Sequence, residues 1–107
     1  MTQSVDLLLA EDNLDEAELT IRELRKYREV NTVFHAKDGE EALEFLLCNG
    51  RFSNTRNMEL PPRLVMLDIQ MPKLNGFDVL RVLKSNDLTR EIPIILFLIW
   101  KKPSKQS

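Results

Sequence analysis

The segment from Leu64 to Gly76 constrains the fold of this chain more than any other. Four apolar residues, Leu64 to Leu67, lead directly into a carboxylate, Asp68. An unbroken apolar run is typical of a strand covered on both faces, and Pro72 ends the pairing because it has no N–H to donate. Gly76 can take backbone angles closed to other residues. Ligands of open α/β sheets bind at the carboxyl ends of strands, so Asp68 is a candidate functional group; the alternative is that it only caps the following turn.

The composition fits one small globular domain spanning residues 1–107, with a polar and basic tail at 101–107. The 107 residues are 43% hydrophobic and 30% charged. The net charge of -2 gives no reason to expect a nucleic-acid partner. A single cysteine, Cys48, excludes an internal disulfide and fits a reducing, cytoplasmic location. No signal peptide is recognised, and the run from Ile94 to Trp100 is too short to cross a membrane as a helix, so no membrane partner is expected.

Strand-like and helix-like segments alternate along the chain. Strands are expected over Val5–Ala10, Asn31–Ala36, Leu64–Asp68 and Ile92–Trp100, and helices from about Leu14 to Tyr27, from Gly39 to before Gly50 and from Gly76 to Lys84. The inward stripes of the helices should be Leu14, Ala17, Ile21 and Leu24, then Ala42, Leu43, Leu46 and Leu47, then Phe77, Leu80 and Leu83. This order predicts an α/β fold, a doubly wound parallel sheet with right-handed crossovers. The polar stretch Arg51–Arg63 is interpreted as a long loop, either solvated or a partner surface.

Carboxylates follow two strands of the predicted sheet. Glu11 and Asp12 come directly after the first strand, and Asp68 ends the third. Three carboxylates in one crevice repel one another unless a cation or protons relieve them, and a hard ion such as Mg²⁺ suits oxygen ligands. The absence of a His or Cys cluster argues against zinc, and the single histidine, His35, is interpreted as structural. The alternative for Glu11 and Asp12 is helix-capping acidity. An aspartate can also act as a nucleophile toward phosphoryl groups.

Three segments together resemble the receiver domain of two-component response regulators. They are Leu9-Ala10-Glu11-Asp12-Asn13, Asp38-Gly39-Glu40-Glu41-Ala42-Leu43, and Leu67-Asp68-Ile69-Gln70-Met71-Pro72 with Asn75-Gly76. The resemblance covers about Val5 to Phe97. It implies a flavodoxin-like (CheY-like) sheet, here with strand order 2-1-3-4. The family's usual last helix-strand-helix is expected to be lacking in this chain. The long loop and the segment Asp12 to Leu19 look like the stand-alone receivers that partner bacterial phytochrome-type kinases.

The resemblance implies a role for each matching position. Asp68 matches the phosphoacceptor, which takes a phosphoryl group from a sensor histidine kinase. Asp12 matches a direct Mg²⁺ ligand, Glu11 an acidic neighbour acting through water, and the backbone carbonyl of Gln70 a further ligand. Such a domain is not an enzyme in the ordinary sense, although it assists its own phosphorylation and dephosphorylation.

The chain departs from the family pattern near its C-terminus. The position of the switch Thr or Ser is Leu98, and no residue is assigned to the lysine role, because Lys102-Pro103 follows the fourth strand almost at once. A truncated or altered receiver is the hypothesis that accounts for this. The fourth strand would then be an apolar edge, which predicts a homo-oligomer formed through Ile94, Leu96, Leu98 and Trp100.

Three other functions are weighed against the signalling phosphoacceptor. The first is a binding or decoy module in which phosphorylation is uncoupled from any output. The second is a phosphatase or mutase with an aspartyl nucleophile, which is disfavoured because such families carry a second Asp where this chain has Gln70. The third is DNA binding, for which no helix-turn-helix segment is recognised.

Overall fold

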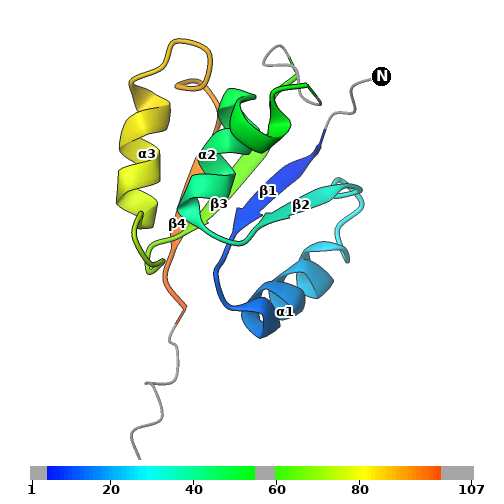
Figure 1. Cartoon of the computed structure of the whole chain (residues 1–107). Helices are drawn as coiled ribbons and strands as arrows, with labels where there is room; N and C mark the ends of the chain where they lie inside the picture. Colours follow the sequence, from blue (N-terminus) through cyan, green and yellow to red (C-terminus); the bar gives the residue numbers. More distant parts are fainter. Residues whose placement is uncertain (1–4, 55–59, 100–107) are drawn as a thin grey trace, which may run out of the picture.

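Four parallel strands form one sheet in the order β2-β1-β3-β4 (Figure 1). The computed structural model describes residues 5–54 and 60–99. Its strands are β1 (Leu7–Ala10), β2 (Val33–Ala36), β3 (Leu64–Asp68) and β4 (Ile94–Phe97), and its helices are α1 (Leu14–Leu24), α2 (Gly39–Leu47), the 3₁₀ helix η1 (Gly50–Phe52) and α3 (Gly76–Lys84). The predicted parallel sheet and its strand order are confirmed.

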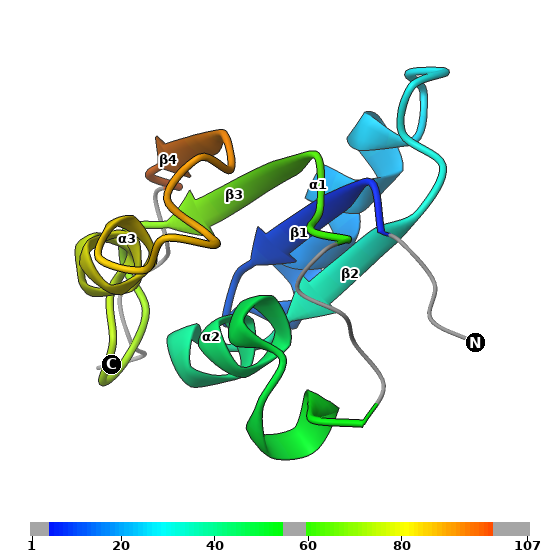
Figure 2. The ribbon, with the colours of Figure 1, turned by 90° about the horizontal axis from the view of Figure 1, so that it is seen from above.

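The helices lie on both faces of the sheet, with α2 and α3 on one side and α1 on the other (Figure 2). Because side chains alternate along each strand, the sheet contributes to two apolar clusters. Leu8, Val65 and Leu67 join the larger one beneath α2 and α3, and Leu7 and Leu9 join the smaller one beneath α1. A strand with both faces covered has no place for an alternating polar residue, which explains the continuous apolar run of β3.

Polar side chains in the loops after β1, β2 and β3 cap the N-termini of the three α-helices. Asn13 Oδ1 accepts from Glu16 N–H at 2.9 Å, and Asp38 Oδ1 accepts from Glu41 N–H at 2.7 Å. Asn75 and Asp78 form a reciprocal capping box at the start of α3. Each cap satisfies N–H groups that a helix leaves open at its first turn. The chain therefore turns from β1 and from β2 into the next helix within a few residues, whereas the loop from β3 to α3 spans residues 69–75.

Several helices and strands were predicted to be longer than they are in the structure. Helix α1 ends at Leu24 rather than Tyr27, and β4 runs only from Ile94 to Phe97. Strand β4 is bounded by its neighbour, since its pairing partners in β3 are Val65 to Asp68. Ile92 belongs to the turn before it, where its N–H donates to Thr89 O. Trp100 lies outside the described residues.

Two side chains predicted to face inward are exposed instead. Leu14 is 69% exposed and Phe77 is 49% exposed. Each lies in the first turn of its helix. Phe45, which was not assigned to the inward stripe of α2, is buried there. It stacks on Phe34 with ring centroids 4.1 Å apart.

The predicted polar loop after α2 begins with structure of its own. Cys48 ends the helix in the left-handed region (φ 57°), and Gly50 repeats that conformation (φ 55°) as η1 begins. Phe52 of η1 packs edge-on against Phe34 and Phe45. No helix among the described residues is long and apolar enough to cross a bilayer.

Candidate functional site

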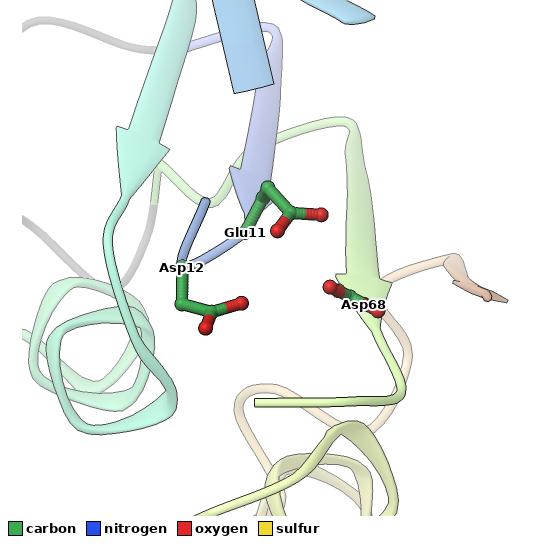
Figure 3. A group of neighbouring side chains, drawn as sticks. All are labelled: Glu11, Asp12 and Asp68. Atoms are coloured by element: carbon green, nitrogen blue, oxygen red, sulfur yellow. The ribbon is translucent and has the colours of Figure 1, made fainter. Parts of the chain in front are cut away.

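Three carboxylates meet at the carboxyl ends of β1 and β3 (Figure 3). Glu11, Asp12 and Asp68 each offer one oxygen, and these oxygens all lie within 4.8 Å of one another. The strand register explains the meeting: Ala10 pairs with Leu67, so the next residue along each strand is a carboxylate. The structure thus brings together the three acidic residues that the sequence singled out.

The three carboxylates differ in their exposure to solvent. Glu11 and Asp68 are fully buried (0% exposed), whereas Asp12 lies closer to the surface. Negative charges a few ångströms apart repel more strongly where water is excluded. A divalent cation would offset that repulsion, and three oxygen donors are the set that a hard ion such as Mg²⁺ prefers. The donor set therefore fits Mg²⁺. Within residues 5–54 and 60–99 the cluster contains no His or Cys ligand, which disfavours zinc.

Backbone N–H groups orient the two buried carboxylates. Asn13 N–H donates to Glu11 Oε2 at 2.9 Å, and Gln70 N–H donates to Asp68 Oδ1 at 3.0 Å. Both contacts span two residues, so each carboxylate is held by the loop that follows its own strand. Gln70 itself is exposed and lies in the loop between β3 and α3, beside Asp68 in the chain.

A shallow hollow of about 590 Å³ opens beside Asp12. Its lining is formed by Asp12 and by the loop and first turn that follow β3, namely Ile69, Gln70, Met71, Pro72, Asn75 and Phe77. Phe77, which was expected in the core, is instead part of the wall. The hollow gives a small ligand access to Asp12 from solvent.

Gly76 is required at this site for a reason that the sequence did not indicate. The φ angle of Gly76 is not in the left-handed region. In the loop before α3, the residue with a left-handed φ is Lys73 (φ 69°). A Cβ on Gly76 would lie 2.8 Å from Asp68 O and 3.1 Å from Ile69 Cα. Gly76 therefore does not use the left-handed angles that are open to glycine. Glycine is needed because the start of α3 touches the end of β3.

Leu98 lies just beyond the end of β4. Phe97 pairs with Asp68, and Ile69 N–H donates to Phe97 O at 2.8 Å, so the chain leaves β4 close to the site. The Leu98 side chain is apolar and 61% exposed, and it cannot donate a hydrogen bond to a phosphoryl oxygen. Lys101 and Lys102 lie outside the described residues.

Sequence reasoning missed one residue that touches the site. His35 Nε2 lies 2.7 Å from the backbone oxygen of Glu11. The only available signal was its place near the end of the second strand, and the contact depends on how β1 and β2 are aligned.

A comparison with protein families gives one clear match. The model of the response regulator receiver domain matches residues 7–105. The chain belongs to the receiver-domain family of response regulators. The resemblance inferred from the three sequence segments is therefore confirmed.

Individual relatives support the same assignment. The chain is 32% identical over 90 residues to a probable methanogenesis regulatory protein, FilR2, of Methanothrix harundinacea (strain 6Ac), an alignment that covers 84% of this chain and 55% of FilR2. The chain thus spans about half the length of the curated relatives it matches first.

Solved structures of phytochrome response regulators share the fold. The bacteriophytochrome response regulator AtBRR superposes with a TM-score of 0.81 at 35% identity, covering 92% of this chain and 69% of AtBRR. The Mn²⁺-bound form of response regulator Rcp1 gives a TM-score of 0.77 at 27% identity, covering 94% and 69%. The predicted likeness to phytochrome-partner receivers is confirmed.

Proposed function

We propose that this receiver accepts a phosphoryl group on Asp68 from a phosphohistidine of a sensor histidine kinase. The observation that carries the proposal is the position of Asp68, buried at a strand end with oxygens of Glu11 and Asp12 within 4.8 Å and a hollow beside Asp12. An aspartate placed this way is a nucleophile at an edge of the sheet where ligands bind.

The transfer needs only one bond to form and one to break. A carboxylate oxygen of Asp68 attacks phosphorus, the bond from phosphorus to the donor nitrogen breaks, and that nitrogen keeps the electron pair and takes up a proton. The Gln70 N–H on Oδ1 holds the carboxylate plane fixed during the attack. The fixed plane reduces the entropy cost of aligning the attacking oxygen with phosphorus.

We assign the cation site of this reaction to the same residues. Asp12 would be a direct ligand of Mg²⁺, Glu11 a ligand through water, and Asp68 and the Gln70 carbonyl the remaining protein ligands. When bound, Mg²⁺ supplies positive charge that offsets both the carboxylates and the incoming phosphoryl oxygens. The occurrence of a Mn²⁺-bound form of Rcp1 supports this assignment.

The test is the intact mass of the protein after exposure to a small phosphodonor with Mg²⁺. The wild-type chain should gain one phosphoryl group, and the Asp68→Asn variant and a chelated sample should gain none. Asp15→Asn, an exposed carboxylate in the first turn of α1, is the matched control and should behave as wild type. An adduct that persists in Asp68→Asn would refute the assignment of the acceptor.

A second candidate function is a self-associating module in which phosphorylation does not drive an output. The observation that favours it is the exposure of apolar side chains around β4. Leu98 is 61% exposed at the position of the missing switch hydroxyl, and Ile95 is 47% exposed. Ile94 and Leu96, which the sequence assigned to the contact surface, pack partly against the main core instead. The proposed contact surface is therefore Ile95 with Leu98.

A further inference from the structure

We propose that His35 is a positioning residue for the acidic site, acting through the peptide group that joins Glu11 to Asp12. The inference rests on the proposed cation site. His35 lies on β2, opposite Leu9 of β1, and its Nε2 reaches past the end of the pairing to the carbonyl oxygen of Glu11 at 2.7 Å.

The direction of this hydrogen bond is fixed by chemistry. A backbone carbonyl oxygen can only accept, so Nε2 carries the proton and donates it. The contact is partly buried and joins residues 24 positions apart in the sequence. It is therefore a long-range tie between two strands rather than a local turn contact.

Both backbone polar groups of Glu11 are bonded to β2. Its N–H donates to Ala36 O at 3.1 Å, and its carbonyl accepts from His35. The first bond continues the regular ladder between β1 and β2. The second hydrogen bond comes from the His35 side chain rather than from a strand backbone, because after Ala10 the chain leaves the sheet toward α1.

Fixing this carbonyl fixes the plane of the peptide that leads to Asp12. The Glu11 and Asp12 carboxylates extend from the two ends of that peptide toward Asp68 (Figure 3). A rotation of the peptide plane would move both carboxylates relative to Asp68. Groups that orient ligands in this way affect metal affinity by roughly 10- to 100-fold in other metal sites.

A merely structural role for His35 makes a different prediction. The imidazole also lines a hollow of about 460 Å³ beside α1, with Leu14, Ile21 and Arg25 among its neighbours. If His35 only fills space there, its replacement should change stability while the folded protein binds cations as before. Affinity and stability therefore separate the two roles.

The experiment is calorimetric titration of Mg²⁺, and separately of Mn²⁺, into the wild-type chain and His35 variants. His35→Phe keeps a planar ring but has no donor, and we expect it to weaken cation binding about tenfold, the lower end of the range for such contacts. His35→Gln places an amide N–H near the position of Nε2 and should retain wild-type affinity. Ile21→Val changes the same hollow without touching Glu11 and is the control.

Each outcome has one meaning. Failure of the wild-type chain to bind either cation would refute the proposed cation site. Wild-type binding with equal affinity in His35→Phe would overturn the positioning role alone, as would equal weakening in His35→Phe and His35→Gln. If His35→Phe does not fold by circular dichroism, His35→Val replaces it, because valine suits a strand and also lacks a donor.

Discussion

Gly76 sets how closely α3 approaches the residue proposed to be phosphorylated. Propensity alone predicts that Gly76→Ala stabilises the chain, since alanine is favoured over glycine in helices by up to about 1 kcal/mol. The structure predicts the opposite, because the added Cβ would lie 2.8 Å from Asp68 O. We expect a loss of about 1–3 kcal/mol of unfolding free energy, typical of overpacking. Urea denaturation measures it, and a more stable variant would contradict the close approach.

Sequence reasoning located the acidic residues of the site but not the contacts that hold them in position. Glu11, Asp12 and Asp68 could be predicted because parallel strands bring their carboxyl ends to one edge, whatever the details of packing. The contact of His35 with Glu11 O could not, because it depends on the alignment of β1 with β2. The need for glycine at 76 likewise comes from a tertiary approach, which no local pattern encodes.

Asp6 ties the starts of β1 and β2 together, and it makes their joint stability depend on pH. Asn31 N–H and Thr32 N–H both donate to Asp6 Oδ2, at 2.8 and 3.1 Å. These bonds, with a smaller contribution from the Arg63 charge, hold the pKa of Asp6 below its ordinary value. A carboxyl whose pKa is lowered by folding stabilises the folded state above the unfolded pKa, and this stabilisation is lost as pH falls through the folded value.

The expected result is a pH-dependent difference between the wild-type chain and Asp6→Asn. The wild type should have the higher urea midpoint at pH 7, and the difference should shrink below about pH 4, where unfolded aspartate becomes protonated. Glu29→Gln, an exposed change in the adjoining α1–β2 loop, controls for the removal of one charge. A difference that stays constant from pH 7 to pH 3 would show that Asp6 contributes no such linkage.

At the scale of elements, the sequence predicted which segments are helices and strands better than it predicted their ends. Strand β3 was predicted with its observed bounds because an apolar run ends at a charge. Strand β4 was predicted too long, because apolar residues continue past the point where β3 stops offering partners. Leu14 and Phe77 fit the helical period of their segments, yet both side chains are exposed in the first turns of α1 and α3.

The helices cover the sheet unevenly, and the part of the sheet that they leave uncovered bears on whether the chain self-associates. Among the described residues, β4 is an outer strand of the sheet with only β3 as a hydrogen-bonded neighbour. Ile95 pairs with Met66, which faces the α1 side, but α1 lies across from β1 and β2 (Figure 2). Outer strands with apolar side chains pair readily with other chains. If a second copy presents the same edge, the unpaired backbone groups of both β4 strands form hydrogen bonds with each other.

We therefore expect the chain to self-associate through β4 at concentrations of about 10⁻⁵ M. Sedimentation velocity should show a dimer, and Ile95→Lys should return it to a monomer, because a charge on an outer strand opposes pairing. The substitution should leave the fold intact, since the Ile95 side chain is already about half exposed. Leu88→Lys introduces the same charge at an exposed leucine away from the sheet and should leave the dimer unchanged. A wild-type chain that sediments as a monomer would exclude this association, and with it the self-associating alternative to phosphoryl signalling.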